Sequence, residues 1–338
     1  MRLADFDYTL PDELVAQRPV SPRDASRLLV VRRETGTIEH RVFREIGEYL
    51  RAGDTLVVND TRVLPARLRG RRLPGGGAAE VFLLRPSADR SWEALVRPGR
   101  RLRRGAVVEV GQSGVRIEIG ERLADGRRAV RALDGMDLLD VLREAGEVPL
   151  PPYIHTPIAD PGDYQTVYAR ADGAIAAPTA GLHFTTELMA GLRAQGIAIV
   201  TLTLHVGLGT FQRVAADDVR EHRMDAEHYT ITPSAAEAIC ARRGRVIAVG
   251  TSTVRALETA AAGGGAISAT SGWTDLFIYP GFGFRLVEGM VTNFHLPRTT
   301  LLMLVSAFAG RELILRAYEE AIRRQYRFYS FGDAMLIV

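Results

Sequence analysis

The sequence contains no lysine, so all 43 of its basic residues are arginine. This absence excludes Schiff-base catalysis by lysine and the phosphate-binding lysine of the P-loop. Cys240 is the single cysteine. It excludes an internal disulfide and is typical of a protein from a reducing compartment. We expect Cys240 to be a small core residue within a helix over residues 234–242.

Long apolar runs are also missing. The longest uncharged one, residues 301–310, is about half as long as a membrane span requires. The acidic start of the chain, with Asp5, Asp7, Asp12 and Glu13, matches neither a signal peptide nor a transit peptide. We therefore expect a soluble cytoplasmic protein with no membrane partner. Its 338 residues, 46% hydrophobic and 25% charged, are enough for two domains with packed cores.

Positive charge is concentrated in one part of the chain. Residues 62–131 hold 17 arginines against 7 acidic residues, whereas the segments on either side are net acidic. A basic module on an acidic body indicates a polyanionic partner, most often a nucleic acid. The alternative is an ordinary solvated surface rich in arginine. The densest stretch contains the five arginines that we predict to bind phosphates: Arg97, Arg100, Arg101, Arg103 and Arg104.

Apolar patterning predicts an α/β protein. Residues 1–61 and the chain after about residue 150 alternate between strands and helices, which favours a mixed sheet covered by helices. Between them, short alternating runs broken by Pro98-Gly99 and Asp125-Gly126 predict a small antiparallel β-barrel. We expect a mixed-sheet α/β main domain over residues 1–65 and 145–338, with the barrel inserted as residues 66–144.

Individual elements follow from the same patterns. The predicted strands of the main domain are 27–31, 55–58, 197–204, 246–249 and 334–338, and those of the barrel are 80–84, 92–96, 106–110 and 115–119. Further helices are predicted over residues 42–50 and 313–326.

Four segments share one design, in which an apolar strand runs into a turn of glycine, hydroxyl and histidine residues. They are residues 176–185, 204–211, 249–258 and 291–297. Glycine permits close approach of the backbone to a ligand, and hydroxyl groups at a helix start can bind an anion. Several such turns at one sheet edge would form a polar pocket. We therefore expect the four segments to converge.

Each feature also has a structural explanation. His183, His205 and His295 stand beside apolar residues, where a lone histidine is usually a satisfied core group. Thr179, Thr251 and Ser252 could simply cap helices. The pair Gly207 and Gly209 lacks the third glycine of a dinucleotide-binding loop.

The segment 221–228 combines two histidines with three carboxylates. Its spacing matches no standard zinc or iron signature, so we expect no metal. General acid or base groups are the better interpretation, because neighbouring carboxylates and histidines can hold separated pKa values.

In combination, these motifs resemble one family, the S-adenosylmethionine:tRNA ribosyltransferase-isomerases of queuosine biosynthesis. The matching stretches run nearly end to end and are residues 58–67, 150–154, 164–168, 177–185, 204–212, 292–297 and 329–337. No single stretch is decisive, but all of them occur in order.

The resemblance implies a fold and a reaction. The family fold is an α/β domain carrying an inserted β-barrel. The reaction moves the ribosyl group of S-adenosylmethionine, rearranged to an epoxycyclopentane, onto 7-aminomethyl-7-deazaguanine at the tRNA wobble position. Adenine and methionine leave, and the product is epoxyqueuosine. The implied partners are tRNA and the co-substrate S-adenosylmethionine; no metal or other cofactor is expected, and we expect a monomer.

One position departs from the family pattern. Members commonly carry His-x-Met-His-x-Glu, whereas this chain has His222-Arg-Met-Asp225-Ala-Glu227. A required histidine base at position 225 is therefore in doubt. Either a carboxylate can serve there, or the position binds without transferring a proton.

The reaction suggests roles for the candidate residues. The expected catalytic residues are His183, His205, Asp225, Glu227 and His295. Thr251, Ser252 and Arg255 are candidates for the methionine carboxylate, and Asn59, Asp60 and Asp333 for the amino group or the sugar hydroxyls. Further expected members of the site are Thr179, Gly207, Gly209 and Thr210.

Two other functions compete with this interpretation. An RNA-binding module without catalysis would explain the basic barrel but not the histidine-bearing turns. An S-adenosylmethionine-dependent methyltransferase would need a glycine-rich strand–helix loop that this sequence lacks.

Overall fold

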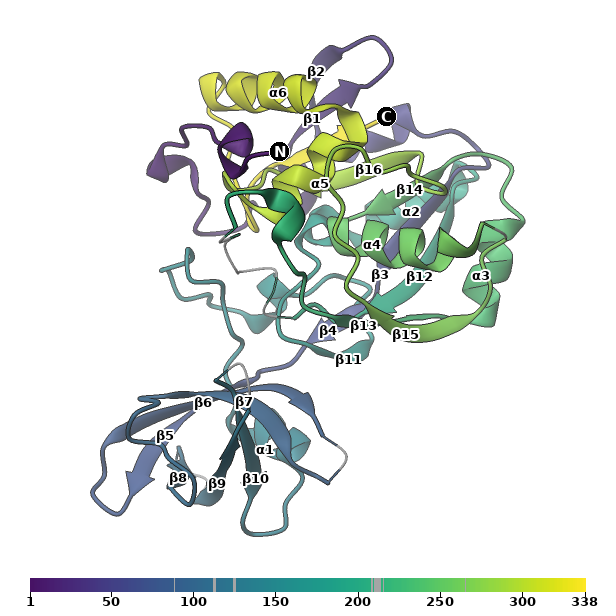
Figure 1. The fold of residues 1–338 in the computed structure, drawn as a ribbon. Coiled ribbons are helices and arrows are strands. Elements are labelled where there is room, and N and C mark those ends of the chain that lie inside the picture. The colour runs from purple at the N-terminus through teal and green to yellow at the C-terminus, as the bar shows by residue number, and fades with distance from the viewer. Residues whose placement is uncertain are drawn as a thin grey trace. The chain divides into compact units, whose positions relative to one another are not determined.

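The structure is a computed structural model of residues 1–338, and it describes all of them except 88, 112–113, 124–125, 208, 210–213, 215 and 265. It divides into two compact units (Figure 1). The main unit comprises residues 1–62, 151–171 and 177–338, and the barrel unit comprises 63–150 and 172–176. The expected fold class, a mixed-sheet α/β main domain with a small antiparallel barrel, is confirmed.

A nine-stranded mixed sheet forms the centre of the main unit. In sheet order its strands are β15 (Thr270–Thr274), β13 (Glu227–Ile231), β12 (Ala198–Leu204), β3 (Thr55–Asn59), β14 (Val246–Val249), β16 (Gly289–Asn293), β17 (Ala334–Ile337), β1 (Arg27–Arg32) and β2 (Thr37–Val42). The four strands β12, β3, β14 and β16 are neighbours and run parallel. A separate small sheet pairs β4 (Thr61–Val63) with β11 (Ala171–Ala174).

Helices cover both faces of this sheet (Figure 1). They are α2 (Thr186–Ala194), α3 (Pro233–Cys240), α4 (Thr251–Ala260), α5 (Thr300–Ala309) and α6 (Arg311–Arg323). The 3₁₀ helices of the main unit are η1 (Leu3–Phe6), η2 (Asp12–Leu14), η3 (Arg23–Ala25), η4 (Phe43–Tyr49), η5 (Pro161–Tyr164), η6 (Thr179–His183), η8 (Val219–Glu221) and η9 (Ala261–Gly263).

One core lies between the sheet and the elements α2, η4 and η6. Leu56 and Val58 of β3 and Ile247 and Val249 of β14 alternate toward it, which is the period of two expected for a strand. Phe184, at the end of η6, is fully buried in the same cluster. The short segment that carries Thr179 and His183 is thus anchored against the sheet.

The predicted helix over residues 42–50 is a 3₁₀ helix, η4. Phe43 and Ile46 are both buried, and residues three apart lie on the same side of a 3₁₀ helix. The expectation that Cys240 is a core residue is wrong. Cys240 ends α3 with an exposed side chain, and its thiol donates a hydrogen bond to the Ile267 carbonyl (3.3 Å).

The barrel unit is a closed barrel of six antiparallel strands and one helix. In barrel order the strands are β10 (Arg128–Ala132), β7 (Trp92–Arg97), β6 (Ala78–Pro86), β5 (Arg67–Leu73), β8 (Val107–Val110) and β9 (Val115–Arg122), and the helix is α1 (Leu138–Ala145). Side chains such as Leu68, Val81 and Ile117 fill its interior and are fully buried. A small barrel of this kind is a packed core, not a channel.

The direction of the strands in the main sheet places many polar residues together. The parallel strands β3, β12, β14 and β16 end at one edge, which we call the carboxyl edge. Antiparallel pairing places the start of β13 and of β17 at the same edge. This is where open α/β sheets commonly bind ligands. Within the part of the chain that the structure describes, no helix is both long and apolar enough to cross a membrane.

Candidate active site

Asn59 ties three elements together at the carboxyl edge. It is fully buried at the end of β3, and its Oδ1 accepts hydrogen bonds from the backbone N–H groups of Leu204 (2.9 Å) and Thr61 (3.2 Å). Its Nδ2 donates to the Leu204 carbonyl (2.8 Å) and lies 3.4 Å from Ser252 Oγ. Because all its hydrogen-bonding groups are engaged, Asn59 fixes the end of β12 and the start of α4.

Asp60 is also buried and engaged. Its carboxylate accepts hydrogen bonds from Thr203 Oγ1 (2.6 Å) and from an Nη of Arg170 (2.9 Å). The Arg170 side chain is 74% exposed, whereas that of Asp60 is 2% exposed. A ligand could therefore reach this carboxylate by displacing the exposed side chain of Arg170.

His205 follows β12 directly and is half-buried. Its Nδ1 lies 2.8 Å from Thr61 Oγ1, which fixes the orientation of the ring. The ring stacks on that of His228 with centroids 6.3 Å apart. Among the candidate histidines, His205 combines a fixed ring with access to solvent, which proton transfer to a substrate requires.

Glu227 and Arg255 form a buried ion pair at the start of β13. Glu227 Oε2 contacts Arg255 Nη1, and Glu227 Oε1 accepts a hydrogen bond from the Gly207 N–H (2.8 Å). The Nε of Arg255 donates to the Leu276 carbonyl (2.9 Å) and its Nη2 to the Thr274 carbonyl (3.2 Å). Each of the three nitrogens of the Arg255 guanidinium thus has one protein acceptor, so binding a substrate carboxylate as well would have to use its remaining N–H groups or displace one of these partners.

Asp225 packs closely on Gly209. A methyl group built on Gly209 would lie 3.2 Å from Asp225 Cβ, so a larger residue at 209 would push the aspartate away. Burial lowers the pKa of His222, and the carboxylate of Asp225 opposes this shift. Thr210, another predicted member of the site, lies outside the described residues.

His183 is buried and neutral. Burial, together with the positive charges of Arg327 and Arg23, lowers its pKa to about 3. Its Nε2 lies 3.2 Å from Asn293 Nδ2, which can only donate, and its Nδ1 lies 2.8 Å from Ser26 Oγ. The proton therefore resides on Nδ1.

His295 is the second buried histidine. Its Nε2 lies 2.8 Å from Thr292 Oγ1, and burial lowers its pKa to about 3. A group with so low a pKa is a weak base at neutral pH. The catalytic role of His183 and His295 stays a prediction, and these environments favour a positioning role.

Thr179 and the start of α4 complete the edge. Thr179 Oγ1 donates to Asn293 Oδ1 (2.9 Å), which links the segment of His183 to the end of β16. Gly250, with a φ of 90°, precedes α4 and donates its N–H to the Val291 carbonyl (2.8 Å). Thr251 and Ser252 occupy the first turn of α4, where N–H groups and the helix dipole favour negative charge.

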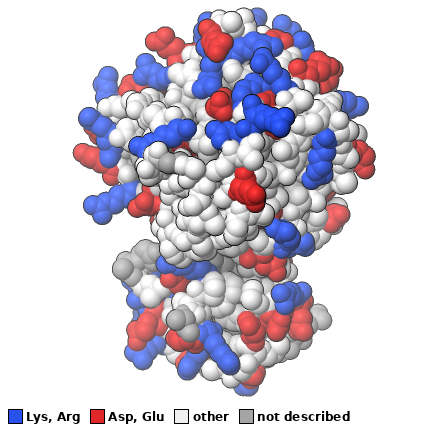
Figure 2. Space-filling view, turned by 90° about the vertical axis from the view of Figure 1, so that its right-hand side faces the viewer, with Lys and Arg blue, Asp and Glu red and all other residues white. Residues whose placement is uncertain are grey.

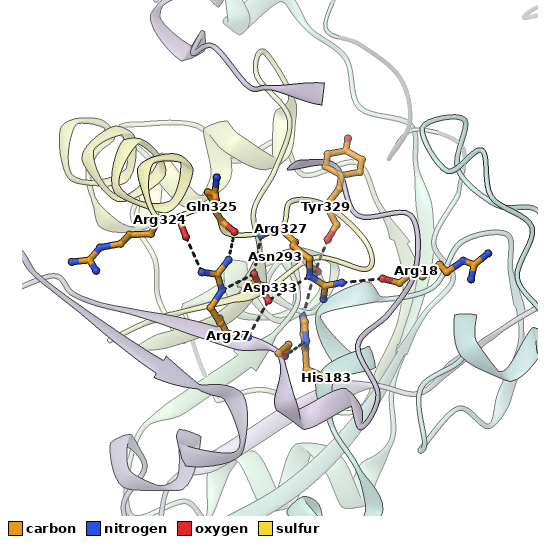
Figure 3. Close-up of polar contacts among 10 residues, drawn as sticks. Arg18, Arg27, His183, Asn293, Arg324, Gln325, Arg327, Tyr329 and Asp333 are labelled. Atoms are coloured by element: carbon orange, nitrogen blue, oxygen red, sulfur yellow. Dashed lines mark hydrogen bonds and ion pairs between the residues drawn. The ribbon is translucent and has the colours of Figure 1, made fainter. Parts of the chain in front are cut away.

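Asp333, which directly precedes β17, is hydrogen-bonded to Arg27 of β1 and to Arg327 (Figure 3). Its carboxylate accepts hydrogen bonds from the backbone N–H groups of Arg27 (2.9 Å) and Arg327 (2.8 Å) and from Arg27 Nε (3.3 Å). With 2% of its surface exposed, Asp333 is a structural anchor, and its expected contact with the substrate stays a prediction.

The described parts of the four predicted segments meet at this edge. Direct contacts join the segment of Thr179 to that of Asn293, and Asn59 bridges the segment of Leu204 to that of Ser252. Two cavities lie elsewhere: one of about 760 Å³ beside β15 and the end of α4, and one of about 710 Å³ beside α6. Neither is lined by a predicted site residue. Among the described residues, no group of three or more histidine, cysteine or acidic side chains is placed to hold a metal ion.

The predicted phosphate-binding arginines lie at one end of the barrel, which we call the arginine end. It is formed where β5 and β7 end and β8 begins. Strand pairing brings four further arginines to this end that the sequence analysis did not select: Arg71, Arg72, Arg122 and Arg128. The signal that could have found them is their position at the ends of strands: Arg71 and Arg72 pair with the start of β8, and Arg128 pairs with Arg122 and with β7.

Most arginines at the arginine end form no ion pair with the residues that the structure describes. Arg104 pairs with Glu121 (2.6 Å), but Arg97, Arg100 and Arg101 are exposed and form no ion pair with any described residue. Elsewhere on the barrel arginines and acids are interspersed, as the face seen in Figure 2 shows. The unpaired charge is therefore concentrated at one end and not spread over the barrel.

Comparisons with known proteins agree with the motifs. The family model described as "Queuosine biosynthesis protein" matches residues 3–337. The chain is 55% identical to the S-adenosylmethionine:tRNA ribosyltransferase-isomerase of Moorella thermoacetica and 54% identical to that of Symbiobacterium thermophilum, in each case over 100% of both chains. It also resembles the crystal structure of S-adenosylmethionine tRNA ribosyltransferase from Thermotoga maritima, with 41% identity, a TM-score of 0.58 and coverage of 99% of this chain and 100% of that one.

Proposed function

The chain belongs to the family of queuosine biosynthesis proteins, and on this premise we propose that it is a transferase and isomerase that acts on tRNA in queuosine biosynthesis. Relatives of equal length that carry this activity in their names support the assignment. In the full proposal, the ribosyl group of S-adenosylmethionine is transferred to 7-aminomethyl-7-deazaguanine at the wobble position of tRNA. It is rearranged to the epoxycyclopentane of epoxyqueuosine, and adenine and methionine are released.

The observation that carries this proposal is the convergence of polar groups at the carboxyl edge. Four parallel strands deliver Asn59, His205, Ser252 and Asn293 to one edge, and hydrogen bonds hold these residues in place. Rigid placement of reacting groups is the main requirement for a reaction with several proton transfers. A module that only bound RNA would need no such arrangement.

His205 is the proposed proton-transferring residue. The reaction requires a base to remove a proton from the ribose carbon beside the sulfonium, whose positive charge acidifies that carbon. His205 is half-buried and oriented by Thr61, whereas His183 and His295 are held neutral inside the protein. Asp225, near Gly209, is the proposed second group, which would accept the proton that the aminomethyl ammonium loses before the neutral amine attacks the ribose.

The arginine end of the barrel is the proposed contact for the tRNA backbone. Its exposed arginines, including Arg97, Arg100 and Arg101, can neutralise phosphates without reading the base sequence. Recognition of the modified base is assigned to the main unit, because the polar residues of the carboxyl edge are there.

A single product analysis tests the proposal. The protein is incubated with S-adenosylmethionine and tRNA carrying 7-aminomethyl-7-deazaguanine, and the small products are separated by chromatography. We expect adenine and methionine in equal amounts and epoxyqueuosine in the digested tRNA. S-adenosylhomocysteine would indicate a methyltransferase, and binding of tRNA without any product would indicate a module without catalysis; either result would refute the proposal.

A further inference from the structure

The loop between α6 and β17 holds a positive charge that the main unit does not neutralise. This loop, residues 324–333, lies at the carboxyl edge and includes Tyr329, whose φ is 73°. A bulky residue at positive φ is a strained conformation that costs about 1–3 kcal/mol and is found mainly at functional sites. The Tyr329 carbonyl accepts a hydrogen bond from Asn293 Nδ2 (3.3 Å), so the strained residue touches the predicted site.

Arg27 is fully engaged within this loop. Its Nε faces Asp333 (3.3 Å), its Nη1 donates to the Arg324 carbonyl (2.8 Å) and its Nη2 to the Gln325 carbonyl. Its guanidinium also stacks on the ring of Tyr326, 4.1 Å from the centroid. Arg27 and Asp333 thus form one balanced pair that closes the end of α6 (Figure 3).

Arg327 is the second arginine on the same carboxylate and has no acid of its own. Its Nε is 3.9 Å from Asp333, and its Nη1 donates to the Arg18 carbonyl (3.1 Å). Its Nη2 is shielded from solvent, yet no described residue accepts a hydrogen bond from it. Burial lowers the pKa of Arg327, and its charge in turn lowers the pKa of His183. A buried guanidinium nitrogen without an acceptor is costly, so Arg327 Nη2 is a candidate donor to a ligand.

We propose that Arg327, through its Nη2, binds the carboxylate of the methionine part of S-adenosylmethionine. This inference rests on the proposed function. In it, Arg327 takes the role of carboxylate ligand that the sequence suggested for Arg255. Each nitrogen of Arg255 already has an acceptor, either Glu227 or a carbonyl, whereas Arg327 offers a desolvated nitrogen for which no described residue is an acceptor. Two arginines sharing one aspartate leave a single positive charge, which matches a monoanion such as a carboxylate.

The location also suits this ligand. Figure 3 shows Arg327 in the same group of polar residues as His183 and Asn293, and its positive charge is close enough to lower the pKa of His183. His183 and Asn293 share a hydrogen bond at the end of β16. A methionine carboxylate held here would direct the remainder of the co-substrate along the carboxyl edge toward β14, β3 and β12.

The test compares S-adenosylmethionine with its decarboxylated analogue, which differs from it by the carboxylate alone. Dissociation constants are measured by isothermal titration calorimetry for the wild-type protein and for Arg327→Gln. We expect the wild type to bind S-adenosylmethionine about 10- to 100-fold more tightly than the analogue, because a charge-assisted hydrogen bond is lost. In Arg327→Gln this preference should disappear, with little change in affinity for the analogue.

Arg324→Gln is the matched control. Arg324 lies three residues away, is exposed and pairs with Glu320 (3.0 Å), so its substitution removes the same charge without touching the proposed donor. We expect it to keep the wild-type preference. Arg327→Lys keeps the charge but not the two-pronged guanidinium, so it should retain part of the preference for S-adenosylmethionine over the analogue. This variant replaces Arg327→Gln in the test if Arg327→Gln does not fold.

Three results would overturn the inference. Equal weakening of both ligands by Arg327→Gln would indicate a structural role, and no weakening of either would exclude contact. Weakened tRNA binding with unchanged S-adenosylmethionine binding would assign the site to a phosphate. Failure of the wild type to bind S-adenosylmethionine would instead refute the proposed function, so the two failures are distinguishable.

Discussion

The carboxyl edge of the main sheet and the arginine end of the barrel use polar residues in opposite ways. At the carboxyl edge, Asn59, Glu227 and Arg255 are buried; Asn59 is hydrogen-bonded to the Leu204 backbone, and Glu227 pairs with Arg255. At the arginine end, Arg97 and Arg100 are exposed and form no ion pair with a described residue. A saturated network holds groups in one geometry, whereas exposed arginines adapt to a flexible backbone. The difference indicates that one region carries out the reaction and the other binds the polyanion.

The largest effect is expected from substitution of His205, which tests whether the carboxyl edge carries out the reaction. His205→Ala should lower the rate of adenine release roughly 10²- to 10⁴-fold, which is the usual contribution of a general acid or base. The stability of the protein should change little, because the ring is half-buried. His228→Ala is the control, since it removes the ring that stacks on His205 but no proposed proton carrier. Near-normal single-turnover release by folded His205→Ala would remove His205 from the mechanism.

Substitution of Arg255 tests whether the buried ion pair at the carboxyl edge stabilises the protein. Arg255→Met leaves Glu227 buried without its counter-charge, and such a loss destabilises a protein by about 3–5 kcal/mol. Arg143→Met is the comparison, because Arg143 and its partner Asp140 are both exposed, and pairs of this kind contribute little. Urea unfolding monitored by circular dichroism measures both variants. Equal effects of the two substitutions would show that the buried pair is not a special part of the edge.

Acid should affect the two units differently. All seven histidines lie in the main unit, and burial lowers the pKa of His183 and of His295 to about 3. As pH falls from about 6.5 toward 3, the unfolded chain binds protons at these histidines and the folded protein does not, so stability is lost. Each contributes about 1.4 kcal/mol per pH unit in this range.

Tryptophan fluorescence can follow each unit during this titration. Trp92 lies in the barrel unit and Trp273 in the main unit, so Trp273→Phe and Trp92→Phe each leave one reporter. We expect the transition reported by Trp273 to move to lower urea between pH 6.5 and 4.5, and more so than that of Trp92. His295→Gln should reduce the slope of stability against pH by the contribution of one histidine. Identical pH dependence of both reporters would contradict the assignment of buried neutral histidines.

The strands of the main sheet that are continuous apolar runs could be predicted, whereas β2, β13 and β15, which mix polar with apolar residues, were not. Residues 246–249 are predicted and observed with the same bounds, since a fully buried parallel strand leaves no polar interruption. Two barrel strands were not predicted. In β5 only Leu68 is buried, and in β10 only Val130, so arginines conceal the alternation.

The burial and the hydrogen-bond partners of each site residue could not be predicted from the sequence. His183 and His205 stand in similar local sequences, yet one is buried beneath Asn293 and the other is accessible beside Thr61. Arg255 looked free for an anion, but its acceptors come from Glu227 at the start of β13, from Thr274 at the end of β15 and from Leu276, which no local pattern connects to α4. Arg327 lies two residues before the matching stretch 329–337, and only the lack of an acceptor for its Nη2 among the described residues distinguishes it.

Neutralising the arginine end should have the smallest effect of the four. In the triple variant Arg97→Gln, Arg100→Gln and Arg101→Gln, we expect tRNA affinity to fall about 10-fold near 0.1 M salt. The slope of log affinity against log salt should become shallower by about 2–3, because each phosphate contact releases about one counterion on binding and three such contacts are removed. Filter binding over a salt series measures both quantities, while thermal unfolding should not change.

The matched control neutralises three barrel arginines that are already paired: Arg85, Arg116 and Arg131, whose partners are Glu93, Asp134 and Glu118. This variant loses the same net charge, but each lost arginine was already compensated by an acid. If tRNA reads the distribution of charge, the first triple weakens binding and reduces the salt slope more than the second. If both triples weaken binding equally, only the net charge of the barrel matters, and the arginine end is no distinct binding surface.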